Sequence, residues 1–415
     1  MFKPKNDIEI MSPVGSYETL MAAIQGKAQA IYFGVGKLNM RSASTLNFTV
    51  EDLESIIAIC NEHHVKAYLT VNTVIYDHEI DEMHRLIDKA KQTGIHAIIA
   101  TDLAVMQYAK SIGMEIHAST QLNISNIEAV KFFSAYCDVM VLARELSLEQ
   151  TAYICQQIEA QNICGPSGNK VKIELFVHGA LCMSISGKCY LSLHENNHSA
   201  NRGACLQNCR RTYTVTDKET GYQLDIENEY IMSPKDLCTI HLIDKIIDAG
   251  VKVLKIEGRA RAPEYVKTVT RCYYEAVESY FNKTYNSQKI SDWMEQLKQV
   301  YNRGFWSGYY MGQKLGEWSE NYGSSATKQK IYVGKITNYF KKINVAEILI
   351  ETNSIKIGQE LLIIGPTTGV VEYSVQEIRL DDNASEKAVK GQKCSIPINT
   401  IVRKNDKVYR WEDRS

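Results

Sequence analysis

Strand-like apolar runs alternate with helical patterns from Ile8 to Gly258 of this 415-residue sequence. There are eight such runs: IEIMSP, AIYFGVG, KAYLTVNTV, HAIIATD, EIHASTQLNI, DVMVLAREL, IELFVHGAL and VKVLKIEG. Eight strands with interposed helices are typical of a (β/α)8 barrel. The alternative, a doubly wound open sheet, normally carries a G-x-G-x-x-G turn after its first strand, and SPVGSYET lacks that turn. The sequence therefore predicts the barrel.

The composition and the pattern of apolar residues change after residue 323. Residues 324–330, SSATKQK, have the composition of a linker, and short β-type runs separated by turn residues follow them. We expect a barrel domain at 1–323 and a small all-β barrel at 331–415. Six basic residues of this second domain could form a phosphate-binding patch, or a solvated surface because acidic residues nearly balance them: Lys341, Lys342, Arg403, Lys404, Lys407 and Arg410.

Cysteines cluster between the seventh and eighth strand-like runs. Four lie within twenty-eight residues, and a fifth follows in SPKDLC: Cys182, Cys189, Cys205, Cys209 and Cys238. The intervening residues are too polar and glycine-rich for buried thiols in an apolar core. The N-terminal residues lack the apolar stretch of a secretory signal, so we expect a cytoplasmic protein without disulfides. A metal site, carried on an insertion at 174–240, accounts best for the cluster.

The spacing of these cysteines bears on the choice of metal. Four thiolates suit zinc and an iron–sulfur cluster equally well in charge and softness. Structural zinc sites usually take two tight cysteine pairs, whereas here the first gap holds six residues and the second fifteen. A cubane tolerates such unequal spacing more easily, so the spacing favours a [4Fe–4S] cluster, with zinc as the alternative.

In a (β/α)8 barrel the active face is built from the carboxyl ends of the strands. We expect four residues at those ends, His178, Arg144, Glu257 and Arg259, to belong to a shared pocket beside the cysteines. Other polar side chains also fall there, although some can act only as helix caps, as Asp102 is expected to do: Ser12, Asn72, Asp102, His117, Ser119, Gln121, Glu145 and Lys255.

One short motif points to a different chemistry. Residues 194–198 spell H-E-x-x-H, in which two histidines one helical turn apart bind zinc in metalloproteases. The chemistry requires a helix, and the two asparagines inside the motif, with Ser199, Asn201 and Gly203 after it, are poor helix formers. We expect these histidines to lie on the loop around the metal instead.

Composition excludes a membrane span and gives no global signal for a polyanionic partner. No run approaches the eighteen or so apolar residues of a membrane helix, and the formal net charge is −1. Binding of a nucleic acid would therefore require a local patch of basic residues.

Several segments resemble the peptidase U32 family, the collagenase-like proteases. The most specific are ELFVHGALC, from Glu174 to Cys182, and GKCYLS, from Gly187 to Ser192. Further similarity covers nearly all of residues 1–312, in the segments IEIMSPVGSYETLMAAIQGKAQAIYFGVGKLNMR, STQLNISN, LARELSLEQ, NRGACLQNCRRTY, SPKDLC, KIEGRARAPEYV and NRGFWSGYY. The C-terminal domain is similar to the small barrel appended in many members, itself like the second domain of translation factors.

The resemblance implies an iron–sulfur enzyme of RNA or cofactor hydroxylation rather than a protease. Cys182, Cys189 and Cys205 match the first three cluster ligands of such members. Some members use a fourth cysteine in a segment like SPKDLC and others one that matches Cys209. We expect Cys238, because a ligand from a separate segment encloses a cubane on another side, with Cys209 as the alternate.

The expected activity is oxygen-independent 5-hydroxylation of the tRNA wobble uridine, with prephenate or a similar organic acid as hydroxyl donor. From their positions at the strand ends, Arg144 and Arg259 would clamp the donor carboxylates, and His178 and Glu257 would transfer protons. The alternatives are a collagenase-like peptidase and hydroxylation of another RNA or of a small molecule. Expected partners are tRNA and, as a dimer, a second copy or a family paralogue.

Overall fold

A closed parallel barrel forms the N-terminal part of the computed structural model, which describes residues 7–42, 48–211, 213–226, 233–313, 316–319, 323–381 and 383–414. Its strands pair in the order β11-β1-β2-β3-β4-β5-β6-β7, and pairing between β11 and β7 closes the ring. The (β/α)8 prediction is confirmed, since an open sheet would leave two unpaired edges. The strands are β1 Glu9–Pro13, β2 Ala30–Gly34, β3 Lys66–Val71, β4 Ala97–Ala100, β5 Glu115–Ala118, β6 Val139–Val141, β7 Lys172–Gly179 and β11 Val253–Ile256.

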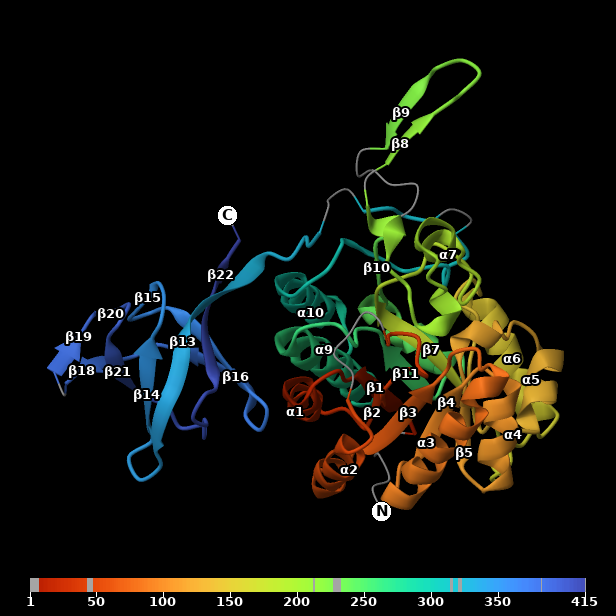
Figure 1. Ribbon diagram of the computed structural model, residues 1–415, viewed down its shortest axis with the longest axis horizontal. Coiled ribbons are helices and arrows are strands. Elements are labelled where there is room, and N and C mark those ends of the chain that lie inside the picture. The colour runs from red at the N-terminus through yellow and green to blue at the C-terminus, as the bar shows by residue number, and fades with distance from the viewer. Residues whose placement is uncertain are drawn as a thin grey trace.

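Helices cover the outside of the barrel (Figure 1). Their buried residues recur at helical spacing, as Met83, Leu86, Ile87 and Ala90 do in α3. Asp102 caps α4 as predicted, because its side chain accepts a hydrogen bond from the Ala104 amide. The helices are α1 Tyr17–Gln25, α2 Asp52–Glu62, α3 Ile80–Thr93, α4 Leu103–Ser111, α5 Ile127–Ser134, α6 Leu148–Ala160, α8 Ile243–Asp248, α9 Pro263–Phe281 and α10 Ser287–Gln299.

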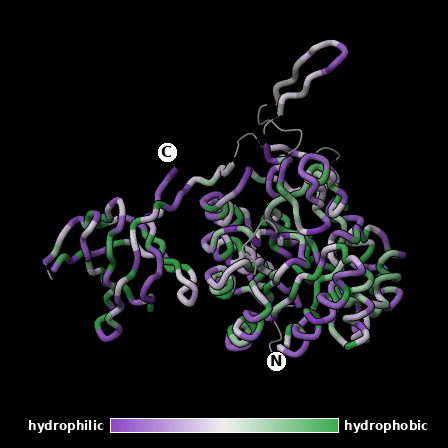
Figure 2. The backbone as a smooth tube through the Cα atoms, in the orientation of Figure 1, coloured by the Kyte–Doolittle hydropathy of each residue, from purple (hydrophilic) through white to green (hydrophobic). Residues whose placement is uncertain are grey.

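Side chains fill the interior of the barrel. An apolar cluster that includes Met11, Tyr32 and Tyr68 packs there, and Figure 2 shows hydrophobic segments along the barrel strands. Lys255 and Glu174 form a buried ion pair of 2.7 Å in the same interior. The barrel is therefore a packed core, and a ligand site has to lie at one of its two ends.

The chain between β7 and β11 leaves the barrel wall and returns. It contains α7 Leu191–Asn196, the strands β8 Tyr213–Thr216 and β9 Gln223–Ile226, whose hairpin projects from the body (Figure 1), and β10 Asp236–Cys238, which pairs antiparallel with β7 and parallel with β12 Phe305–Trp306. Gly179 makes the departure from β7 sterically feasible. Its φ is +105°, and a Cβ there would lie 2.5 Å from the Glu257 carbonyl oxygen.

The C-terminal part is all-β, as predicted, and its strands pair antiparallel in sheets that do not form a closed ring within the described residues. Eight strands pair in the order β17-β16-β22-β13-β14-β21-β18-β19, and β15 pairs with β20. Three residues of the expected linker, 328–330, already belong to β13. The strands are β13 Lys328–Phe340, β14 Val345–Ile350, β15 Ser354–Lys356, β16 Glu360–Gly365, β17 Gly369–Ser374, β18 Ile378–Leu380, β19 Asn383–Ser385, β20 Lys387–Val389, β21 Lys393–Pro397 and β22 Lys407–Asp413.

The C-terminal sheet packs against α1 and α9 of the barrel (Figure 1). The Gln25 side chain donates to the Thr368 carbonyl oxygen at 2.8 Å and accepts from the Val370 amide at 2.9 Å. Lys267 on α9 pairs with Glu372 at 2.8 Å. Among the described residues, no helix has the length and apolar character that crossing a membrane requires.

Candidate functional site

A cavity of about 230 Å³ opens at the carboxyl ends of the barrel strands. Five polar residues that were expected at strand ends line it: Asn72, Gln121, Arg144, Glu257 and Arg259. The rest of its wall comes largely from the cysteine segment, which we define as residues 180–211. This is the end of a (β/α)8 barrel where ligands bind.

The other polar residues expected near the strand ends are absent from the described lining. Asp102 caps α4. His117 is buried, and its Nε2 lies 3.0 Å from Glu115. Glu145 lines a different cavity, of about 710 Å³, beside α6. Position at a strand end therefore selects the right region, but it does not decide which way a side chain points.

Positive charge dominates the cavity. Among the described lining residues, Glu257 is the one carboxylate, and six are arginines: Arg41, Arg144, Arg210, Arg259, Arg261 and Arg303. Arg41 pairs with Glu257 at 2.7 Å and Arg303 with Asp236 at 3.4 Å. Arg210 instead donates to neutral acceptors, the Ser233 hydroxyl and the carbonyl oxygens of Pro234 and Leu181. The excess of guanidinium groups suits an anionic ligand.

Arg144 and Arg259 face this cavity from opposite sides of the β7–β11 junction. Arg144 donates to the Ala180 carbonyl oxygen at 3.0 Å and lies 3.9 Å from the centre of the Phe176 ring. Within the described part of the chain, its buried Nε lacks a hydrogen-bond partner. Arg259 donates to Thr70 Oγ1 at 2.9 Å and Asn39 Oδ1 at 3.2 Å, and burial lowers its pKa to about 10. Among the described residues, neither guanidinium forms an ion pair with a carboxylate, so both can pair with a bound anion.

Glu257 is ionised in this environment. Burial alone raises the pKa of its carboxyl group, but the charges of Arg41, Arg261 and Arg144 and the hydrogen bond from Arg41 outweigh burial and lower that pKa below its ordinary value. At neutral pH an ionised carboxylate has no proton to give, although it can take one that a reacting group releases. Glu257 can therefore serve as a base in the cavity and is poorly suited to be an acid.

His178 differs from the expectation that it belongs to the pocket. It is buried outside the described lining, with Nδ1 3.4 Å from the Tyr273 hydroxyl and its ring 5.9 Å from Tyr265 and 5.5 Å from Phe305. Burial lowers the pKa of the imidazole to about 3. The physical reason is a register shift between β7 and β11, where Phe176 pairs with Lys255 and His178 with Ile256. Such a bulge reverses the alternation of side chains beyond it.

Four of the five clustered cysteines line the cavity together: Cys182, Cys189, Cys205 and Cys209. Each is at least partly accessible to solvent. Cys238, the expected fourth ligand, is fully buried on β10, with its sulfur 3.7 Å from Met294 Sδ and 4.0 Å from the Tyr273 hydroxyl. The structure thus brings the alternate, Cys209, together with the first three predicted ligands and leaves Cys238 apart.

The chemistry of these four thiols fits a [4Fe–4S] cluster, and it also fits zinc. In the stretches that the structure describes, no three His, Cys, Asp or Glu side chains converge closely enough to hold a metal ion. The sulfur atoms therefore share a cavity wall without standing at ligand spacing. Four thiolates are nevertheless a suitable set of ligands for such a cluster. The residues that would hold it are the four cysteines that line the cavity.

The cysteine segment is fastened to the barrel by polar contacts on both sides. Arg202 donates to both carboxylate oxygens of Glu79, and its guanidinium lies 4.0 Å from the centre of the Tyr76 ring. Asn123 donates to the Ser186 carbonyl oxygen at 3.1 Å. These contacts hold the thiols over the mouth of the barrel.

The H-E-x-x-H motif does not lie on one helix. The helix α7 ends at Asn196, and Asn197 has a left-handed backbone conformation with φ 54°. Glu195 accepts a hydrogen bond from the Asn208 side chain. The helical spacing that the zinc protease chemistry requires is therefore lost, as expected, although His194 lies on α7 and not on a loop.

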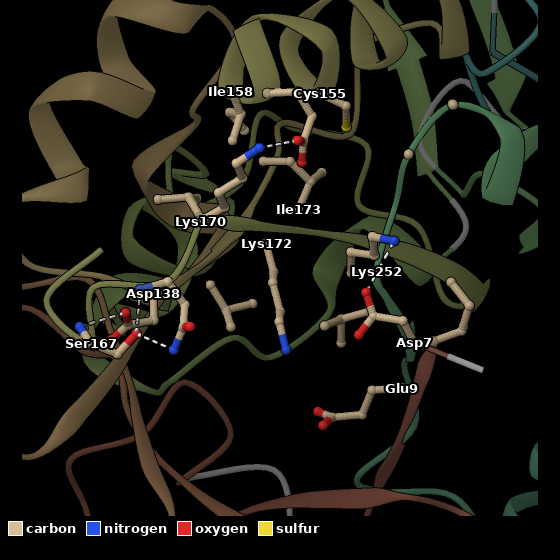
Figure 3. A pocket seen from close by; sticks show the side chains of 18 of the residues that line it. Asp7, Glu9, Asp138, Cys155, Ile158, Ser167, Lys170, Lys172, Ile173 and Lys252 are labelled. Carbon is tan, nitrogen blue, oxygen red and sulfur yellow. Dashed lines mark hydrogen bonds and ion pairs between the residues drawn. The ribbon is translucent and has the colours of Figure 1, made fainter. Parts of the chain in front are cut away.

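A larger cavity, about 1230 Å³, lies at the amino ends of the strands (Figure 3). Its charged lining residues largely neutralise one another. Lys252 pairs with Asp7 at 3.1 Å, as Figure 3 shows, and Lys66 pairs with Glu9 at 2.7 Å. None of the predicted site residues lines it, and this end of a (β/α)8 barrel usually serves stability.

Sequence reasoning missed four of the six arginines of the cavity: Arg41, Arg210, Arg261 and Arg303. All four lie within segments that carry the family resemblance, in KLNMR, NCRRTY, KIEGRARAPEYV and NRGFWSGYY. The arginine content of those segments could therefore have indicated these cavity residues from the sequence. Strand periodicity could not show them, because none of these four residues lies on a strand.

Comparisons with known proteins agree on one family. A model described as "Peptidase family U32" matches residues 15–320. A Porphyromonas gingivalis protein named collagenase is 60% identical, with 99% of each chain covered. The Bacillus subtilis tRNA hydroxylation protein P1 is 29% identical, over 90% of this chain and 87% of that protein. The Escherichia coli 23S rRNA 5-hydroxycytidine C2501 synthase is 31% identical, over 75% of this chain and 46% of that enzyme.

Proposed function

This chain belongs to peptidase family U32, and we propose that it hydroxylates C5 of the tRNA wobble uridine. The proposed hydroxyl donor is prephenate or a similar organic acid. The base would gain one oxygen and the donor would lose one, so that C–H becomes C–OH in uracil and C–OH becomes C–H in the donor. Molecular oxygen takes no part in this balance.

The cavity at the barrel mouth carries this proposal, because arginines and four thiols line the same small space. Guanidinium groups pair with carboxylates in a bidentate geometry, which suits a donor with two carboxylates. A volume of about 230 Å³ has the scale of a small acid or a single flipped base. Similarity to the B. subtilis tRNA hydroxylation protein along 90% of the chain supports RNA as the second substrate.

The residues would divide the work as follows. Arg144 and Arg259 hold the donor carboxylates, and the unpartnered Nε of Arg144 is a ready donor. Glu257, ionised beside Arg41, takes the proton released at C5 and returns it to the donor fragment. A [4Fe–4S] cluster held by Cys182, Cys189, Cys205 and Cys209 would supply electron transfer beside the cavity.

Nucleoside mass spectrometry of tRNA tests the proposal. A strain that lacks this gene and any paralogue should lose 5-hydroxyuridine derivatives. The wild-type gene should restore them, and a gene encoding Arg259→Gln should restore few. Unchanged 5-hydroxyuridine in that strain would contradict the proposal. If hydroxycytidine of ribosomal RNA disappears instead, the substrate is the one named for the E. coli relative.

The second candidate is a peptidase, favoured by 60% identity to a protein named collagenase. Against it, the described lining of the cavity includes no histidine that could activate a thiol or hydroxyl. Digestion of denatured collagen by the purified chain decides between the two. Hydrolysis that persists in Cys209→Ser and Arg259→Gln variants would place a protease site elsewhere on the molecule.

A further inference from the structure

Two neighbouring loops form an exposed tip on the C-terminal sheet, one between β13 and β14 and one between β21 and β22. The Ile398 amide donates to the Asn344 carbonyl oxygen at 2.7 Å, and the Tyr339 hydroxyl donates to the Ile398 carbonyl oxygen at 3.2 Å. These contacts hold the loops side by side. We name this region the hairpin-tip surface and define it by Phe340, Lys341, Lys342, Ile343, Ile401, Arg403 and Lys404.

The hairpin-tip surface combines exposed apolar side chains with positive charge. Phe340, Ile343 and Ile401 are 41%, 67% and 41% exposed. Its four cations are exposed as well, and none of them forms an ion pair within the described part of the chain. The sequence has no carboxylate at 338–346 or 398–405. Asp406, which comes next, is buried and accepts hydrogen bonds from Thr368 and the Arg403 amide.

The structure also reduces the number of residues that can belong to the basic patch indicated by the sequence. Arg410 is half-buried on β22 and pairs with Glu412 at 3.3 Å, so it is not part of an exposed patch. Lys407 is exposed, but it lies on β22 opposite Lys335 and outside the two loops of the tip. Lys341, Lys342, Arg403 and Lys404 remain, and all four belong to the two loops of the tip.

We propose that the hairpin-tip surface binds RNA, an inference that rests on the proposed function. Lysine and arginine neutralise backbone phosphates, and an exposed aromatic ring offers a stacking surface for an unpaired base. Phe340 with its flanking lysines supplies both features within one loop. The surface is a contact site remote from the chemistry and belongs to a different domain from the cavity.

The position of this surface limits the kind of RNA that can use it. In Figure 1 the β13–β14 tip lies at the lower left, away from the cysteine segment at the top of the barrel. A ligand that reaches both must be large and extended. A folded tRNA meets this requirement, and a short anticodon stem-loop does not.

Binding of full-length unmodified tRNA and of its anticodon stem-loop to the full chain tests the inference, measured by fluorescence anisotropy at several salt concentrations. Lys341→Glu/Lys342→Glu should weaken tRNA binding about tenfold or more and reduce the salt dependence by roughly one to two phosphate contacts. Stem-loop affinity should not change. Phe340→Ala should cause a smaller, few-fold loss. The matched control is Lys387→Glu/Lys390→Glu, which makes the same charge change at exposed positions of the same domain.

Three results would overturn the inference. One is tRNA affinity that survives the Lys341/Lys342 reversal. Another is an equal loss with the control pair, which would reveal a general charge effect. The third is unchanged RNA binding with lost binding to phosphatidylserine vesicles, which would assign the surface to a membrane. If tRNA binding depends on the tip while 5-hydroxyuridine is unaffected by gene deletion, the surface stands and the proposed reaction fails.

Discussion

The cavity at the amino ends of the strands measures about 1230 Å³, and the one at the carboxyl ends about 230 Å³. The larger one is lined by lysines and carboxylates that pair with each other, such as Lys66 with Glu9. The smaller one holds six arginines, one carboxylate and four thiols among its described residues. Uncompensated positive charge and thiol groups distinguish the end at which we propose the active site from the amino end of the barrel, and cavity volume does not. Four experiments can break or sharpen this contrast.

The largest effect is expected from removing a thiol of the small cavity. Cys209→Ser should abolish the iron content and the broad visible absorption of protein purified without oxygen, because a cubane needs four ligands. Cys238→Ser is the matched control, since its sulfur contacts Met294 and Tyr273 away from the cavity. Iron loss in Cys238→Ser with retention in Cys209→Ser would reverse our assignment. Stoichiometric zinc in colourless wild-type protein would replace the cluster altogether.

Arg259→Gln should weaken prephenate binding by roughly 10- to 100-fold, the cost of a charge-assisted hydrogen bond to a carboxylate. Isothermal titration calorimetry measures this effect. Arg259 donates hydrogen bonds to the neutral acceptors Thr70 and Asn39, so the substitution leaves no buried carboxylate without a partner. Equal affinity in the variant would show that the cationic lining does not hold the donor.

His178 is expected to affect stability rather than binding. Its pKa of about 3 in the fold lies below the value near 6.5 of an unfolded chain, so the native state loses stability as pH falls from 6.5 towards 3. By pH 4 the loss amounts to roughly 3 kcal/mol. In His178→Phe this part of the acid sensitivity should vanish, measured by urea unfolding at pH 4 and pH 8. Tyr273 keeps its hydrogen bond to the Val177 carbonyl oxygen. A large loss of prephenate affinity in this variant would instead place His178 in the site.

The smallest effect should come from the large cavity. Lys172→Gln alters its lining at a residue that forms no ion pair within the described part of the chain. We expect prephenate affinity and iron content within about twofold of wild type, because the packed barrel interior separates the two ends. A tenfold change in either measurement would mean that the ends communicate, and the contrast between them would fail.

Much of the fold was predictable, because strand and helix periods are local properties. The alternation of apolar runs predicted all eight barrel strands, and Asp102 was expected to cap α4. Arg144, Glu257 and Arg259 were expected in the cavity from their places at strand ends. Arg41 and Arg303 could not be placed by such reasoning, because they lie on loops whose path depends on the whole structure.

The sequence by itself determined the barrel, the all-β C-terminal part and the concentration of thiols after β7, since these follow from hydrophobic period and composition. Tertiary structure decided the membership of the site. A register shift beside β11 turned His178 away from the cavity, and packing on β10 buried Cys238 while Cys209 joined the other three thiols. The physical reason is that side-chain direction and loop position depend on contacts between residues far apart in the chain, which local patterns do not encode.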